Sequence, residues 1–223
     1  MNVSEAVSTR LSVRAFRDTP IPPAVLRQVL EKAARAPSGG NVQPWRLHVL
    51  GGAPLIQFKS SMRARLSTNS EPDPPEYDIY PENLWEPHRT QRFRVGEMMY
   101  ALLGIPREHK AARLQWFASN FDFFGAPAAQ FCFIDRRMGP PQWSDLGMYL
   151  QTVMLLLREY GLASCAQECW SRYHSTVRAF VEAPDDHLLF CGMAIGYADD
   201  SAPVNRLVSE RMPLSEFATF RGI

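Results

Sequence analysis

The stretch SDLGMYLQTVMLLLREYG, residues 144–161, constrains the fold more than any other part of the sequence. Ser144 or Asp145 can cap the N-terminus of a helix there, and Gly161 can end it. The apolar residues between them point in nearly every direction around a helix axis, so no side of this helix suits solvent. We therefore expect a buried central helix with the rest of the chain packed around it.

The flanking sequence alternates between helical and strand-like patterns. Val25, Leu26, Val29 and Leu30 recur at the spacing of one helical face. Together the patterns predict helices over 22–36, 54–66, 88–103, 107–121 and 171–182, and strands over 46–50, 128–135 and 187–198. Because the strands are few for the length of the chain, the predicted fold class is an α+β sandwich rather than a long doubly wound sheet.

Composition excludes several classes of partner. The 223 residues carry 24 basic and 23 acidic side chains, so no global field attracts nucleic acid or a membrane surface. No window approaches the roughly 18 apolar residues of a membrane span, and the first residues lack a signal-peptide core. The four cysteines form no CxxC pair, which suits free thiols in a reducing compartment. We expect a soluble, cytoplasmic protein with no nucleic-acid partner and no membrane partner.

The first candidate site is RLSVRAF, from Arg10 to Phe16. In an extended segment, Arg10, Ser12 and Arg14 would all point to one side. Two guanidiniums that flank a hydroxyl make a good phosphate receptor, because the planar fork of arginine matches phosphate oxygens. The alternative is a pair of solvated surface arginines.

The second candidate site is the loop PSGGNVQPW, which lies between the first long helix and a strand. Ser38, Gly39 and Gly40 let backbone N–H groups approach a ligand, while Asn41 and Gln43 offer amide donors and acceptors. The chain has no GxGxxG and no GxxxxGK[ST], so neither a Rossmann nor a P-loop site is indicated. Alternatively, the loop only ends the helix.

Two further stretches are weaker signals on their own. GLASCAQECW (161–170) contains Cys165, which with His174 could suggest a thiol nucleophile, although a buried cysteine is more often a small apolar residue. Cys165, Cys169 and His174 lack the spacing and the fourth ligand of a structural zinc site, so no metal is expected. Near the C-terminus, SERMPL places Arg211 in a basic loop before a turn.

The four stretches in this order resemble the nitroreductase family of flavoproteins. The pattern R-x-S-x-R-x-F, then A-P-S-G-G-N-x-Q-P-W, G-L-x-S and E-R-x-P-L spans the chain from Arg10 to about Phe217. The resemblance implies one domain over residues 1–223, a three-layer α/β/α sandwich around a mixed, mainly antiparallel sheet. It also implies an intertwined homodimer with FMN at the subunit interface. Segment 67–125, which is rich in proline and aromatic residues, would be an insertion or lid over the active site.

The resemblance also implies roles for particular residues. The phosphate and ribityl side of FMN would be held by Arg10, Leu11, Ser12, Arg14 and Arg211. The partner chain would contribute Pro37, Ser38 and Gly39, with Asn41 and Gln43 ordering that loop. The flavin ring would lie along Cys165, Ala166, Gln167 and Glu168, with a backbone N–H near Gln167 or Glu168 directed at its reactive nitrogen. Many relatives have proline where Ala166 stands. Substrate contacts are expected from Tyr80, Trp85 and Phe124, and Trp45 is expected to pack behind the loop.

The implied activity is an FMN-dependent oxidoreductase that transfers hydride from NAD(P)H, through FMN, to a nitroaromatic, quinone or similar small-molecule acceptor by a ping-pong mechanism. No catalytic side chain is required, because the chemistry takes place on the flavin. Three alternatives stay open: reductive dehalogenation or other flavin chemistry on the same scaffold, a non-catalytic flavin-binding module, and a thiol hydrolase. The sequence distinguishes neither NADH from NADPH nor one acceptor from another.

Overall fold

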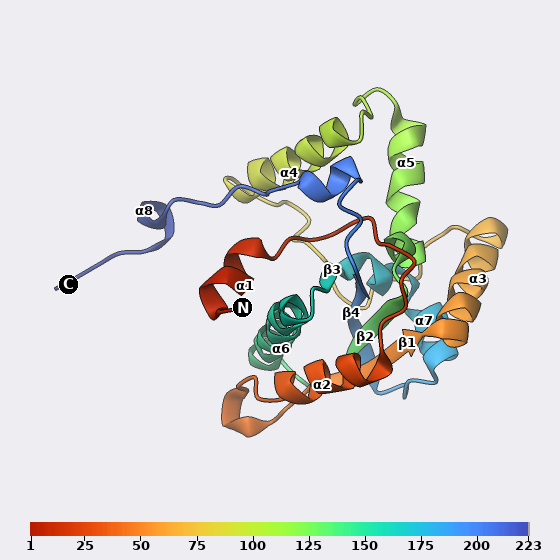
Figure 1. Cartoon of the computed structure of the whole chain (residues 1–223), viewed down its shortest axis with the longest axis horizontal. Helices are drawn as coiled ribbons and strands as arrows, with labels where there is room; N and C mark the ends of the chain where they lie inside the picture. Colours follow the sequence, from red (N-terminus) through yellow and green to blue (C-terminus); the bar gives the residue numbers. More distant parts are fainter. Residues whose placement is uncertain (223) are drawn as a thin grey trace.

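The computed structural model describes residues 1–222, which form helices around a four-stranded sheet (Figure 1). The strands are β1 (Arg46–Gly51), β2 (Ala128–Asp135), β3 (Ala163–Gln167) and β4 (His187–Gly196), in the order β1-β2-β4-β3. All three neighbouring pairs are antiparallel. An isolated parallel bridge joins Ser12 to Ser164 on the outer edge of β3. The sheet is therefore mainly antiparallel, as predicted, and its parallel contact is this isolated bridge.

Two hydrophobic cores lie on opposite faces of this sheet, which makes the fold a three-layer α/β/α sandwich. Alternate residues of β2 enter different cores, Cys132 on one side and Phe131 and Phe133 on the other. The Cys132 side is covered by α2 (Pro23–Ala33) and α6 (Pro140–Glu159). The Phe131 side is covered by α3 (Gly52–Thr68), α7 (His174–Val181) and the 3₁₀-helices at Ser119–Gly125 and Glu168–Tyr173.

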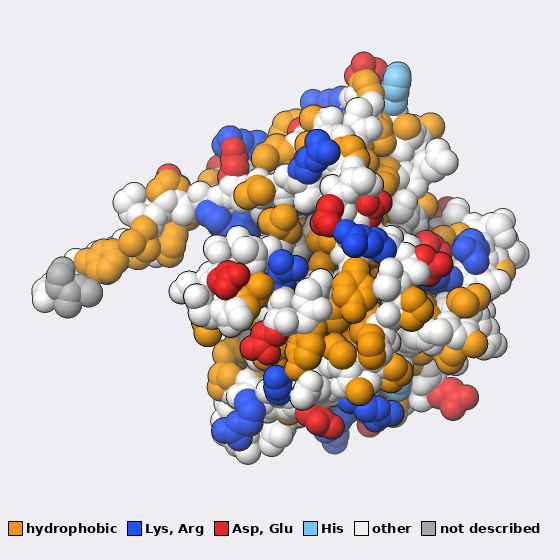
Figure 2. Space-filling view, in the orientation of Figure 1, with side chains coloured by type: hydrophobic (Ala, Val, Ile, Leu, Met, Phe, Trp, Pro, Cys, Tyr) orange, Lys and Arg blue, Asp and Glu red, His pale blue; other side chains and the backbone are white. Residues whose placement is uncertain are grey.

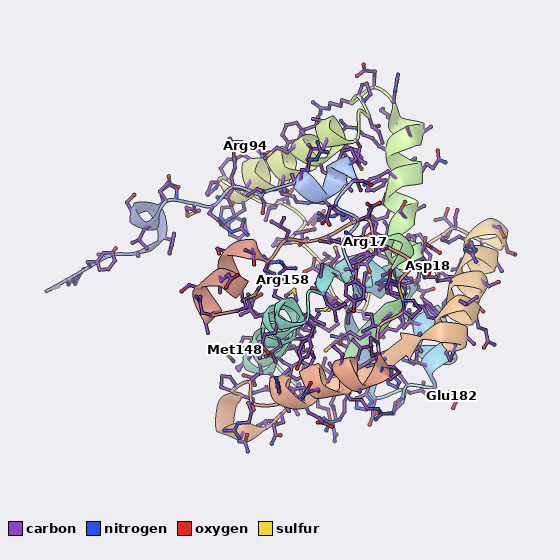
Figure 3. All side chains as sticks on the ribbon, viewed as in Figure 1. Arg17, Asp18, Arg94, Met148, Arg158 and Glu182 are labelled. Atoms are coloured by element: carbon purple, nitrogen blue, oxygen red, sulfur yellow. The ribbon has the colours of Figure 1, made fainter. Side chains whose placement is uncertain are left out.

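Helix α6 differs from its prediction at the N-terminus and on one face. It begins at Pro140, because two prolines fit the first turn and Gly139 donates its N–H to the Gln142 side chain. Ser144 and Asp145 consequently lie inside the helix and cap nothing. Leu146, Val153 and Leu157 are fully buried, but Met148 on the outer face is 39% exposed and points away from the body (Figure 3). The prediction of a helix buried on all sides is wrong for the single chain.

The Phe131-side core is built around Trp170, which is fully buried. Its indole packs on four phenylalanine rings at centroid distances of 4.5–5.4 Å, those of Phe58, Phe121, Phe123 and Phe131. Gly192 of β4 faces the same indole with only a hydrogen where other residues have Cβ. The strand and the ring can therefore approach each other closely.

Segment 67–125 is ordered and contributes to both the core and the outer surface. Tyr77 donates its hydroxyl to the Phe190 carbonyl and packs edge-on against Trp143, while Phe121 and Phe123 are buried. These three aromatic residues of the segment therefore pack in or against the two cores. The rest of the segment forms α4 (His88–Leu102) and α5 (Lys110–Ala118), which project from the sheet at the top of Figure 1.

Glu76 anchors the start of this segment to the end of the sheet. Its carboxylate accepts hydrogen bonds from Arg136 and Arg178, and the ring of His174 lies 3.6 Å away. Burial alone would raise the pKa of Glu76, but the two guanidiniums outweigh it, so the pKa lies below its ordinary value.

The ends of the chain contain elements that the sequence patterns did not indicate. Helix α1 (Val3–Thr9) is capped by Asn2, whose side chain accepts the N–H of Glu5. Beyond the short helix α8 (Leu214–Phe217), the last described residues extend away from the body (Figure 1). No helix within residues 1–222 is long and apolar enough to cross a membrane.

Candidate functional site

Three arginines from distant parts of the sequence line one hollow of about 460 Å³. Arg10 and Arg14 come from the extended segment after α1, and Arg211 comes from the segment before α8. The first segment is fixed beside β3, because Val13 donates its N–H to the Ser164 carbonyl at 3.1 Å and Arg14 donates its N–H to the Asn205 side chain at 2.8 Å. Leu11 and Ser12 also line the hollow.

None of these three arginines has a carboxylate partner among the described residues. Arg14 donates to the Ser12 carbonyl at 3.1 Å, and Arg211 donates to the Ser209 hydroxyl at 2.7 Å. Three guanidiniums at one hollow without an acidic residue favour a bound anion of high charge, such as a phosphate. Arg206 lines a different hollow, next to Arg158.

A second hollow, of about 620 Å³, lies next to the first, because Arg14 lines both. One wall is the end of β3 and the residues after it, which include the predicted ring contacts Cys165, Ala166, Gln167 and Glu168. The Gln167 side chain is buried and turned away: it donates to Asn120 at 2.9 and 3.1 Å and accepts the indole N–H of Trp170 at 3.3 Å. Gln167 therefore connects this wall to the aromatic core.

The opposite wall of this second hollow is aromatic. Of the three expected substrate contacts, Tyr80 and Phe124 line it, but Trp85 lies outside the lining residues, is 60% exposed and packs on His88. Sequence reasoning missed Met99, Tyr100, Trp116 and Phe117 of α4 and α5, Asn120, and two arginines, Arg92 and Arg172, which line the same hollow. The many aromatic residues of segment 67–125 indicated that some of these side chains could face a ligand. The weak helical periodicity of the segment did not show which side of each helix faces inward.

The titratable groups of the second hollow do not form a nucleophilic pair. Burial raises the pKa of Cys165 and that of Cys169, so both thiols stay protonated near neutral pH. His174 is engaged elsewhere, since its Nε2 lies 3.0 Å from the Pro74 carbonyl oxygen. The geometry therefore gives no support to a thiol hydrolase. Desolvation also raises the pKa of the Glu168 carboxyl at the wall of the hollow.

The loop after α2 lines neither hollow in this chain. The N–H of Gly39 lies 3.2 and 3.3 Å from the two oxygens of the buried Asp145 carboxylate on α6. Within the loop, Gln43 donates its N–H to the Ser38 hydroxyl and its side-chain amide to the Asn41 carbonyl. Pro37 and Ser38 precede the 3₁₀-helix Gly39–Asn41, and Gly40, Asn41 and Gln43 all have positive φ. The loop is thus held in a defined conformation, and Asp145 is a support that sequence reasoning took for a helix cap.

Trp45, directly after this loop, packs as predicted. Its ring stacks on Tyr149 of α6 at a centroid distance of 4.7 Å.

Comparison with known proteins identifies the family. A model described as the nitroreductase family matches residues 7–197. The 4-nitrobenzoate reductase of Pseudomonas putida is 36% identical over 217 residues, which cover 97% of this chain and 94% of the relative. The nitrobenzene nitroreductase of Ectopseudomonas oleovorans is 33% identical, with 98% and 96% covered. The chain therefore belongs to the nitroreductase family.

Solved structures agree with this assignment. The crystal structure of the FMN and NADPH-dependent nitroreductase NfnB from Sphigopyxis sp. strain HMH superposes with a TM-score of 0.96 at 50% identity, and each chain is fully covered. The FMN-dependent nitroreductase NfnB from Mycobacterium smegmatis, solved in complex with NADPH, gives a TM-score of 0.90 at 32% identity, with 99% of this chain and 100% of the relative covered.

Proposed function

We propose that this protein is an FMN-dependent oxidoreductase that uses NAD(P)H to reduce nitroaromatic, quinone or similar small acceptors. The observation that carries the proposal is the pair of adjoining hollows, one lined by three arginines without carboxylate partners and the other walled by aromatic side chains. The relatives named as nitrobenzoate and nitrobenzene reductases, and as FMN- and NADPH-dependent enzymes, support it.

The residues present fit FMN in their donor chemistry. Arg10, Arg14 and Arg211 would hold its phosphate, with Leu11 and Ser12 toward the ribityl chain. The flavin ring would lie along Cys165–Glu168 in the second hollow, where Cys165 and Gln167 are buried and Ala166 is exposed. Arg14, which lines both hollows, would contact the cofactor where its two parts meet.

When bound, FMN would supply the redox chemistry that connects oxidation of NAD(P)H to reduction of the acceptor. The protein itself would bind the cofactor and orient the acceptor. The aromatic wall from Tyr80, Tyr100, Trp116 and Phe124 offers stacking surface to a planar acceptor and keeps water from it. We infer that α4 and α5 act as the lid of this site within a single domain, because they supply most of that wall while both cores share one sheet.

We also infer a homodimer in which each subunit completes the other's site. The loop at Pro37–Gln43 lies outside both hollows of its own chain, yet it is held rigidly by Asp145. The outer face of α6 leaves Met148 exposed, and Phe217 and Phe220 of the extended C-terminal segment are more than half exposed. Figure 2 shows apolar side chains along this protruding segment. Such apolar surface is costly in water and suits burial against a second copy.

An apolar groove of about 630 Å³ beside the edge strand β1 offers a place for the partner's C-terminal segment. Sedimentation of the full chain and of a chain ended after Pro213 tests this inference. A dimer that dissociates on truncation supports it, and a full-length monomer contradicts it. The four cysteines are free, which suits a reducing compartment such as the cytoplasm.

The decisive experiment is the visible absorption spectrum of the purified protein, recorded anaerobically before and after addition of NADPH and then NADH. A flavin spectrum that bleaches with either reductant, and returns on addition of a nitroarene, is the expected result. A flavin spectrum that neither reductant bleaches would favour a non-catalytic flavin-binding module. Failure of the protein to bind added FMN would contradict the proposal.

A further inference from the structure

Two arginines of the second hollow have no carboxylate partner among residues 1–222. Arg92 on α4 lies with its guanidinium carbon 4.1 Å from the ring centroid of Tyr80. Arg172, from the 3₁₀-helix after β3, lies 6.0 Å from the ring centroid of Phe117 on α5. Both guanidiniums lie beside aromatic rings of this hollow, and both residues are exposed. They form a cationic rim on an apolar interior.

Arg92 differs from the two other arginines of α4, because each of those forms an ion pair with a glutamate. Arg89 pairs with Glu86 at 2.7 Å, and Arg94 pairs with Glu210 at 2.6 Å; Figure 3 labels Arg94 on α4. These two face outward and line no part of the second hollow. On α4, therefore, the arginine that lines this hollow is the one whose charge stays free for a ligand.

The charges around the second hollow favour an anion. Besides Arg92 and Arg172, its charged lining residues are Arg14 and Glu168, which leaves a net positive site. A guanidinium beside an aromatic ring can bind a carboxylate at the edge of an arene that stacks on the same wall.

We propose that Arg92 and Arg172 recognise an anionic substituent of the acceptor, so that the preferred acceptors are aromatic carboxylates bearing a reducible group. This inference rests on the proposed function, since it assigns the substrate class of the same site. Arg92 and Arg172 do not line the hollow proposed for the cofactor phosphate, which is lined by Arg10, Arg14 and Arg211.

The test compares a charged acceptor with a neutral one of the same shape. On the FMN-loaded enzyme, kcat/KM is measured for 4-nitrobenzoate and 4-nitrobenzamide in the wild type and in the Arg92→Gln, Arg172→Gln and double variants. Binding of benzoate and benzamide, which cannot be reduced, is measured in parallel from the change in flavin absorbance. Arg89→Gln is the matched control, because it removes a guanidinium from the same helix outside the hollow.

The proposal predicts that each single variant loses at least about fivefold of its preference for the charged compound, as expected for a partly exposed ion pair. This loss should be seen in the ratio of kcat/KM for 4-nitrobenzoate over 4-nitrobenzamide and in the ratio of the affinities for benzoate over benzamide. The proposal also predicts that FMN affinity, activity with neutral nitrobenzene and the Arg89→Gln ratio stay unchanged. An unaltered ratio in the double variant would overturn it. The proposal would also be overturned if the variants lost activity only with NADPH and not with NADH. That result would assign the two arginines to the extra phosphate of NADPH. If the wild type reduces neither 4-nitrobenzoate nor a neutral nitroarene, the proposed function itself fails.

Discussion

Replacing Gly192 by alanine is expected to destabilise the protein through Trp170. A Cβ at position 192 would lie 2.3 Å from Cδ1 of the Trp170 indole and 2.8 Å from its Nε1. Carbon atoms pack at about 3.5 Å or more, so the strand and the ring must separate by about 1.2 Å. The ring cannot move freely, because it is fully buried among four phenylalanines.

Overpacking of this kind costs about 1–3 kcal/mol, and the rigid surroundings place Gly192→Ala at about 3 kcal/mol. For a chain of this size we expect the apparent Tm to fall by about 6–12 °C. Flavin retention should fall with it, because the Trp170 indole donates to Gln167 at the wall of the second hollow.

Thermal unfolding at matched protein and FMN concentrations, followed by circular dichroism, measures this effect. The matched control is Gly96→Ala on α4, where an added Cβ meets no atom within 4 Å. Alanine there should be neutral or stabilising by about 0.5–1 kcal/mol, because it is the better helix former. If Gly192→Ala unfolds within about 2 °C of the wild type, the argument from close packing at Trp170 is refuted.

Three further predictions concern the site and its supports. Arg211→Met should weaken FMN binding about 10- to 100-fold in a fluorescence titration of the apoprotein, while Arg206→Met, in a different hollow, should not; equal affinities would refute the phosphate assignment. Asp145→Asn should cost about 1–2 kcal/mol in urea unfolding, because the buried carboxylate loses its charged hydrogen bond with the N–H of Gly39. Glu76 has a pKa below its ordinary value of 4.5, so it stabilises the fold above that pH and loses this contribution as pH falls through its folded pKa. The unfolding midpoint of the Glu76→Gln variant should therefore depend less on pH below about 4.5 than that of the wild type. Parallel plots of midpoint against pH for the two proteins would contradict the stabilising role of Glu76.

The predicted helices and strands are all present, whereas short elements with weak patterns, such as β3, were not predicted. The strand predicted over 128–135 is β2 with the same bounds, because a long apolar run between turn residues leaves little choice. The five residues of β3, ASCAQ, are mostly small and show no clear alternation. They form a strand because β4 on one side and Ser12 on the other supply partners, which is information from distant sequence.

Local capping rules failed at the N-terminus of α6 for a similar reason. Asp145 has the chemistry of a cap, but it is 3% exposed inside the helix and binds a backbone N–H of the loop after α2. A carboxylate in an otherwise apolar helix predicts a buried partner, and only the tertiary structure shows which one it is. The same helix looks apolar on all sides because its outer face carries the apolar Met148, which is exposed in the single chain.

The site divides into a part that sequence motifs located and a part that they did not. Alternation in an extended segment predicted that Arg10, Ser12 and Arg14 would share one side, and they line one hollow with Arg211. No local pattern indicated that Tyr100, Trp116 or Arg92 would face the neighbouring hollow. Their helices have little amphipathic character, so the direction of each side chain depends on how α4 and α5 dock.

The two walls of the second hollow also differ in how firmly they are attached to the rest of the fold. The wall formed by β3 is joined to β4 along its length and to the N-terminal segment through Ser164, so it is fixed to the centre of the sheet. The aromatic wall comes from α4 and α5, and neither helix has a fully buried residue. Elements with few buried contacts open at low free energy, whereas central strands open only near global unfolding. The cofactor would therefore sit on the rigid wall while the acceptor meets the movable one, and substitutions on α4 should change acceptor choice with little effect on flavin binding.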